Sequence, residues 1–101
     1  MPEIYFEVRW PDGAVQRCYS PSTVVEEYFT AGHAYDLADF VERSRTALAI
    51  AGERVREKFG FFCTGASGQL AQIEQTAHAY AAVAGATVTV ESLRRADGSK
   101  R

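Results

Sequence analysis

The longest regular pattern in the chain lies between Asp36 and Gly60, where small and apolar residues recur at spacings of three and four. The stripe consists of Leu37, Phe40, Val41, Ser44, Leu48, Ala51, Val55 and Phe59. Such spacing places side chains on one face of an α-helix. Asp36 suits the N-cap, and Gly60 suits the left-handed residue that often follows a helix. The pattern therefore predicts one long amphipathic helix over residues 36–59, whose apolar face must be buried against another element.

The amino-terminal residues have a different period. Ile4, Phe6, Val8 and Trp10 alternate with Glu3, Tyr5, Glu7 and Arg9. A period of two predicts a half-buried β-strand. The sequence Pro-Asp-Gly at residues 11–13 is typical of a tight turn, so a hairpin partner is expected over residues 14–19. Neither face of this second strand is consistently apolar, and which of its faces is buried is left open.

Further along the chain, a short helix is expected over about residues 20–29. Either Ser20, followed by Pro21, or Thr23, paired with Glu26 in a capping box, could begin it. Residues 30–35 are predicted to form a loop. A third helix is expected to begin between residues 64 and 67 and to end at Gly85, and a strand rich in β-branched residues follows at 87–93.

The resulting fold class is α+β, with element order ββαααβ. We expect a small three-stranded sheet, formed by the hairpin and the carboxy-terminal strand, with the first strand central. One short and two long helices should cover one face of this sheet. The chain has 101 residues, of which 47% are hydrophobic, enough for one core. We expect a single domain over residues 1–95 and a flexible basic tail over residues 96–101.

Composition and charge argue against several classes of protein. The net charge of −2 gives no general attraction to nucleic acid or anionic lipid. The basic residues of the long helix are Arg43, Arg45, Arg54, Arg56 and Lys58, and they alternate with Glu42, Glu53 and Glu57. No run of about 20 apolar residues and no export signal is present. We therefore expect a cytoplasmic protein, with no nucleic acid or membrane among its partners and with both cysteines reduced.

Cys63 and Thr64 form the first candidate site, for a ligand or a reactive thiol. They precede a glycine-rich segment that opens the third predicted helix, whose free N–H groups could lower a thiol pKa or hold an anion. The alternative interpretation is that Cys63 is a small buried apolar residue beside neighbouring phenylalanines.

Cys18, Tyr19 and Ser20 form the second candidate site. They could place a thiol, a phenol and a hydroxyl at the mouth of a pocket, where a strand gives way to a helix. Alternatively, these residues are only a strand end followed by an N-cap. If Cys18 and Cys63 converge in the fold, a two-thiol site becomes testable.

Metal and cofactor chemistry is not indicated. His33 and His78 are the only histidines, and with the two cysteines they could in principle bind zinc. No ligand pair has the short spacing typical of zinc sites, so we expect no metal site. The glycine-rich segment lacks the lysine and spacing of a phosphate-binding loop, and we expect no cofactor.

Several blocks of the chain together resemble a known family. They are residues 9–13 (RWPDG), 18–22 (CYSPS), 39–41 (DFV), 43–48 (RSRTAL), 53–55 (ERV) and 59–63 (FGFFC). In these blocks the chain resembles the small nitrogen starvation response proteins of bacteria, over roughly residues 1–75. Such proteins are encoded in a gene cluster with a nitrilase, a radical SAM protein, an acetyltransferase, an aminoimidazole ribonucleotide synthase-like protein and a flavoprotein.

The resemblance implies a role in nitrogen scavenging, with nitriles or cyanide as sources, but it carries no catalytic residues. The favoured hypothesis is a noncatalytic accessory or interaction protein for nitrogen-scavenging enzymes, with protein partners from the same gene cluster. An exposed sheet edge would also suit a homodimer. The alternative is a small-molecule-binding protein or minor enzyme that uses Cys63, with or without Cys18.

Overall fold

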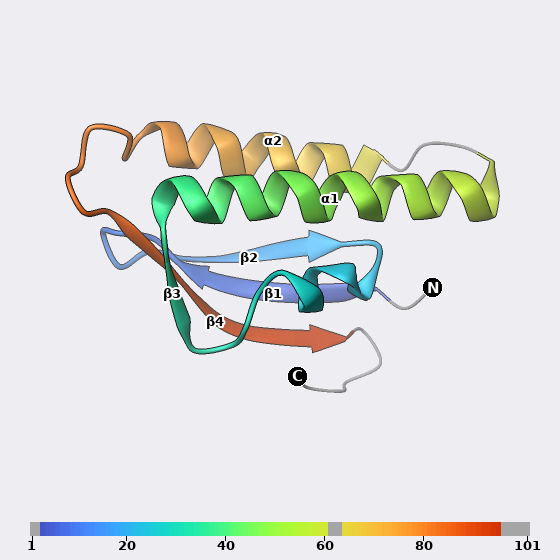
Figure 1. The fold of residues 1–101 in the computed structure, drawn as a ribbon, viewed down its shortest axis with the longest axis horizontal. Helices are drawn as coiled ribbons and strands as arrows, with labels where there is room; N and C mark the ends of the chain where they lie inside the picture. The colour runs from blue at the N-terminus through green and yellow to red at the C-terminus, as the bar shows by residue number, and fades with distance from the viewer. Residues whose placement is uncertain (1–2, 61–63, 96–101) are drawn as a thin grey trace.

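The structure is a computed structural model that describes residues 3–60 and 64–95. In chain order its elements are β1 (Ile4–Arg9), β2 (Val15–Ser20), the 3-10 helix η1 (Thr23–Glu27), β3 (His33–Asp36), α1 (Leu37–Phe59), α2 (Thr64–His78) and β4 (Thr87–Arg95). The strands form one antiparallel sheet, and α1 and α2 lie side by side on one of its faces (Figure 1). The α+β class and the one-sided helical layer agree with the sequence prediction.

The sheet has four strands in the order β2-β1-β4-β3, so the prediction of three strands was wrong. The missed strand is β3, in the segment expected to be a loop. It pairs with β4, with Tyr35 opposite Val88 and Asp36 opposite Thr87. With four residues, the strand is too short to show a clear alternation of apolar and polar side chains. The strand is stabilised by its pairing with β4 and by the packing of the Tyr35 ring against that of Phe29, with the ring centroids 5.4 Å apart.

The described helices also differ from the expected three. The first is a single 3-10 segment capped by Ser22, whose Oγ accepts a hydrogen bond from the N–H of Val24. Neither expected start is used, because Ser20 is still part of β2 and the N-cap is Ser22 rather than Thr23. Helix α2 ends at His78 rather than near Gly85, since tighter backbone turns follow it, including Tyr80 N–H to Ala77 O at 3.0 Å.

Strand β1 is central, as predicted, and pairs with both β2 and β4. Val8 lies opposite Val90, and Phe6 lies opposite Cys18 on one side and Leu93 on the other. On β2, Cys18 and Ser20 are buried, whereas Val15 and Arg17 are exposed. This burial identifies the inner face of β2, which the sequence left open.

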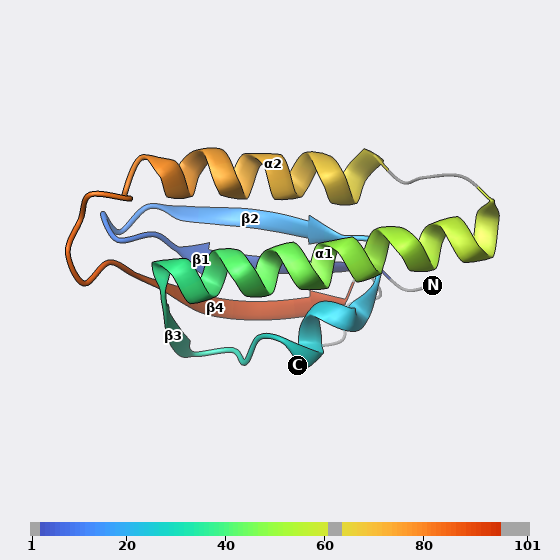
Figure 2. The same ribbon diagram turned by 45° about the horizontal axis from the view of Figure 1, so that its top comes forward.

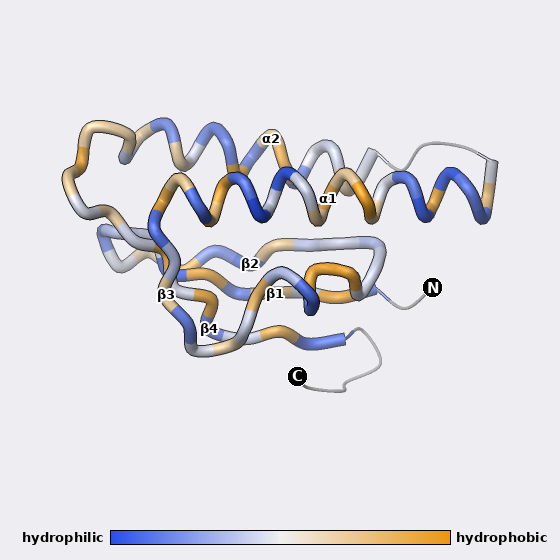
Figure 3. Tube along the Cα trace, viewed as in Figure 1, coloured by the Kyte–Doolittle hydropathy of each residue, from blue (hydrophilic) through white to orange (hydrophobic). Residues whose placement is uncertain are grey.

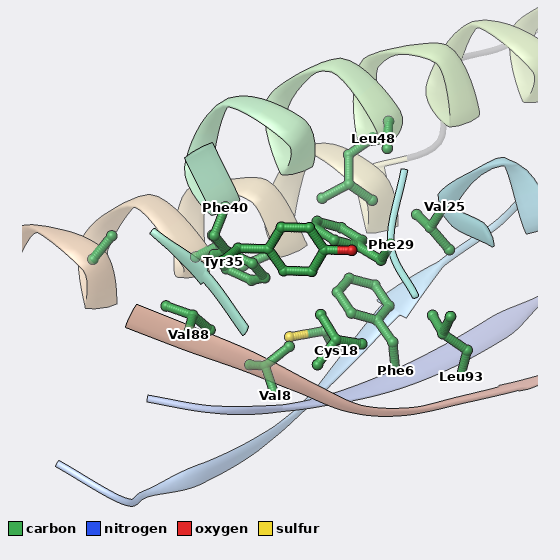
Figure 4. Packing of buried hydrophobic residues seen from close by; sticks show 14 of the residues in the cluster. Phe6, Val8, Cys18, Val25, Phe29, Tyr35, Phe40, Leu48, Val88 and Leu93 are labelled. Carbon is green, nitrogen blue, oxygen red and sulfur yellow. The ribbon is translucent and has the colours of Figure 1, made fainter. Parts of the chain in front are cut away.

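The core lies between the sheet and the helices, and aromatic rings fill its centre (Figure 4). The ring centroids of Phe29 and Phe40 are 5.3 Å apart, and Trp10 meets Phe40 edge-on at 5.6 Å. Leu48, midway along α1, is 2% exposed and belongs to the same cluster. The apolar stripe of α1 therefore faces the sheet as far as Val55, whereas Phe59, which the sequence prediction included in the stripe, is 54% exposed. Figure 3 shows hydrophilic residues concentrated at the helix's carboxyl end.

Both ends of α1 lie where the sequence placed them. The backbone of Asp36 occupies the N-cap, although its side chain makes no capping hydrogen bond. Gly60 takes φ 81°, a conformation that glycine adopts without a steric cost, and its N–H bonds to Arg56 O. The last turns of α1 extend past the sheet (Figures 1 and 2).

A bidentate ion pair joins the end of β4 to η1. Arg95 Nε lies 3.2 Å from Glu26 Oε2, and its Nη2 lies 3.0 Å from Oε1. The Glu26 side chain is only 8% exposed. Two parallel hydrogen bonds to a largely buried carboxylate fix geometry better than a single surface contact. This pair therefore fastens the last strand to the segment that follows β2.

We predict that Leu48→Ala lowers the free energy of unfolding by about 2–5 kcal/mol, because it leaves a cavity at the centre of the helix–sheet interface. Chemical denaturation with a circular dichroism readout measures this loss. Val83→Ala is the control, since Val83 is 49% exposed and its truncation should cost less than about 0.5 kcal/mol. Equal effects of the two substitutions would contradict the assignment of Leu48 to the core.

Candidate functional site

Cys18 is a packed core residue. It is 0% exposed, and Figure 4 shows it between Val8 and Phe6 on the inner face of the sheet. Burial raises the pKa of its thiol from the ordinary 9.0 to about 12. At neutral pH this thiol is therefore protonated and enclosed by side chains, which does not favour nucleophilic or metal-binding chemistry.

Ser20 is also enclosed, and its hydroxyl serves the chain turn. Its Oγ donates to Ser22 O at 2.7 Å and accepts from Ser22 N–H at 3.2 Å. Both partners lie in the connection from β2 to η1. The hydroxyl therefore stabilises this connection by one donated and one accepted hydrogen bond.

Tyr19 points to the opposite face of the sheet from Cys18 and Ser20. Its hydroxyl donates to a carboxylate oxygen of Glu3 at 2.7 Å. Its backbone N–H donates to Gln69 Oε1 of α2 at 3.0 Å. Because neighbouring residues of a strand point to opposite faces, the three candidate side chains do not share one site.

Of the other candidate pair, Cys63 lies outside the described residues. Thr64 is the first residue of α2 and is exposed, and its carbonyl accepts a hydrogen bond from Ser67 Oγ at 3.3 Å. The convergence of Cys18 and Cys63 stays a prediction.

The two histidines lie on different elements, His33 on β3 and His78 at the end of α2. The ring of His33 lies 4.4 Å from that of Tyr35, and His78 lies at a surface depression between the helices. Across residues 3–60 and 64–95, no group of three or more His, Cys, Asp or Glu side chains is arranged to hold a metal ion. In the same ranges, no helix is long and apolar enough to cross a membrane.

The outer face of the sheet carries a cluster that the sequence reasoning missed. The guanidinium of Arg17 lies 4.1 Å from the ring centroid of Tyr5, and the Tyr5 ring lies 5.6 Å from that of Tyr19. We call these three residues the Tyr–Arg cluster. Its signal was present in the sequence, because Tyr5 lies in the polar phase of β1, and Arg17 and Tyr19 share one phase of β2.

A second surface feature lies between the first turns of α1 and the end of α2. It is an open depression of about 430 Å³. Leu37, Val41 and Ala77 supply apolar lining, and Glu42, Arg45 and Glu74 supply charged lining. The lining comes from two separate stretches, residues 37–45 and residues 74–81, so the depression depends on the packing of the two helices.

Comparison with known protein families matches residues 5–93 to the family described as nitrogen starvation-induced protein NitG. The chain belongs to the NitG family. The match extends from β1 into β4, and so includes residues of all four described strands. It confirms the expected link to the nitrogen starvation response. No curated protein and no solved structure matches the chain.

The state of Cys18 can be measured in a Cys63→Ser variant, in which Cys18 is the only thiol. A shift in pKa from 9.0 to about 12 lowers the thiolate fraction at pH 7 about 1000-fold. Iodoacetamide should therefore label the native variant far more slowly than the denatured one. Labelling of the denatured variant should level off above about pH 9, whereas native labelling should keep rising through pH 11. Native labelling as fast as that of the denatured chain would contradict the burial of this thiol.

Proposed function

We propose that this NitG-family protein is a noncatalytic accessory or interaction protein that serves nitrogen-scavenging enzymes during nitrogen starvation. Its partners would be proteins encoded in the nitrilase-containing gene cluster, and it would act in the cytoplasm. The family match supports the link to nitrogen starvation. The accessory role draws its support from the outer face of the sheet.

The observation that carries the proposal is the Tyr–Arg cluster. Tyrosine and arginine are enriched at protein–protein interfaces, where they provide large contact areas at a low cost in side-chain entropy. Here the guanidinium of Arg17 already lies over the Tyr5 ring, and the Tyr5 and Tyr19 rings are already in contact at a tilt of 55°, before any partner arrives. Such preorganisation reduces the entropy that binding would otherwise cost.

Charged residues of both signs surround the cluster. Arg9 pairs with Glu91 of β4, and Glu7 accepts a hydrogen bond from Ser92. No described helix covers this face, because α1, α2 and η1 lie on the other side, where the buried residues of the sheet point (Figure 2). A polar rim around aromatic anchors is the usual composition of a non-obligate interface.

Pairing through a sheet edge has less support than contact through this face. At the β2 edge the N–H of Tyr19 is already bonded to Gln69, and at the other edge β3 has only four residues. Short or covered edges disfavour the addition of a strand from another chain. A homodimer that formed would therefore be expected to use a surface other than the edges.

The alternative function, thiol chemistry at Cys63 with Cys18, loses support from the enclosed position of Cys18. A function that used Cys63 would need to draw its other groups from elsewhere in the chain.

An affinity purification from nitrogen-starved cells tests the proposal with two matched charge reversals. Arg17→Glu disrupts the Tyr–Arg cluster, whereas Lys58→Glu makes the same change in charge on α1. Wild type and Lys58→Glu should co-purify the same nitrogen-scavenging enzyme, and Arg17→Glu should recover about 10-fold less, in line with loss of an interface anchor. Thermal unfolding verifies that both variants fold. Equal recovery with Arg17→Glu, or no such enzyme with wild type, would refute the proposal.

A further inference from the structure

The depression between α1 and α2 combines apolar lining with an unbalanced set of charges. Its volume of about 430 Å³ lies within the range of small-molecule sites. Leu37 and Val41 are half-buried, and Ala77 is buried. These side chains offer apolar contact to a short hydrocarbon chain.

Arg45 is held by two carboxylates at this depression. Its Nη1 lies 2.9 Å from Glu42 Oε2, and its Nε and Nη2 lie 2.9 and 2.8 Å from Glu74 Oε2. Both carboxylates thus contact Arg45 through their Oε2 atoms. Hydrogen bonding to Glu74, with a smaller contribution from Glu42, raises the pKa of Arg45 and keeps it charged.

The charges at the depression therefore do not cancel. Glu42 and Glu74 contribute two negative charges against the one positive charge of Arg45. The Oε1 atoms of the two glutamates retain acceptor capacity, because each carboxylate oxygen can accept more than one hydrogen bond. The depression disfavours an anionic ligand, because both carboxylates would repel it and the guanidinium of Arg45 is already bonded to them.

We propose that this depression binds a small organic cation, namely a primary alkylammonium ion with a short apolar chain. The ammonium group would donate to the glutamate oxygens, and the chain would lie on Leu37, Val41 and Ala77. The site lies on the helical layer, away from the outer face of the sheet. It is therefore independent of the proposed accessory function, and either one can fail without the other.

Titration with butylammonium, followed by two-dimensional NMR of the folded full-length chain, tests the proposal. Backbone amides within residues 37–45 and 74–81 should shift and saturate, with a Kd on the order of 1–10 mM for so small a ligand. Butanol and butyrate, added at the same ionic strength, provide the neutral and anionic controls. Both should produce weaker, unsaturated shifts. Equal shifts with butanol, or none with butylammonium, would overturn the proposal.

A pair of matched variants tests the role of the carboxylates. Glu74→Gln should weaken butylammonium binding about 2- to 5-fold, the effect expected for loss of one partly exposed charge. Glu53→Gln is the control, because Glu53 forms an i,i+3 ion pair with Arg56 on α1, as Glu42 does with Arg45, but lies outside the depression. The amide spectra show directly whether each variant is folded. Equal weakening by the two variants would refute site-specific recognition.

Discussion

The pairing of β4 with both β1 and β3 is the interaction on which the rest of the structure depends. Among the strands that the structure describes, β4 alone links the amino-terminal hairpin to β3. Its inward residues Val88, Val90 and Leu93 are at most 3% exposed and join the core beneath the helices. The ion pair of Arg95 with Glu26 then fixes the end of the strand to η1. Because a two-stranded hairpin is at best marginally stable alone, the carboxy-terminal strand makes one cooperative unit of the chain.

The sheet also divides the candidate site residues of β2 between two environments. Alternation along β2 places Cys18 and Ser20 against the core and Arg17 and Tyr19 on the outer face. Burial suppresses the ionisation of the thiol, whereas the Tyr–Arg cluster, with Arg17 exposed and both tyrosines half-buried, lies on the face that no described helix covers. The strand's period of two thus places the Cys18 thiol in the core and the Tyr–Arg cluster, our proposed contact surface, on the outer face. This arrangement is consistent with the accessory role that we propose, whereas the family match itself shows only the link to nitrogen starvation.

The sequence predicted the elements whose signals are local. The period of α1, the glycine at its end and the turn at residues 11–13 each reflect a conformational preference of a few neighbouring residues, and the structure bears them out. Strand β3 escaped prediction because its stability comes from β4 and from the contact of Tyr35 with Phe29. The ion pair of Arg45 with Glu74 joins two helices, so no local pattern could reveal it. The Tyr–Arg cluster depended on the register of β1 with β2, although the polar phases of these strands contained its three residues.

Truncation of the carboxy terminus is the most direct test of the central role of β4. Removal of residues 86–101 deletes the whole strand, whereas removal of residues 96–101 leaves it intact and is the matched control. Urea denaturation, monitored by circular dichroism and by Trp10 fluorescence, should show a cooperative transition for the shorter truncation, close to that of the full chain. The longer truncation should show no cooperative transition, because β1 and β3 would lose their shared neighbour. An unchanged transition after removal of residues 86–101 would contradict the account.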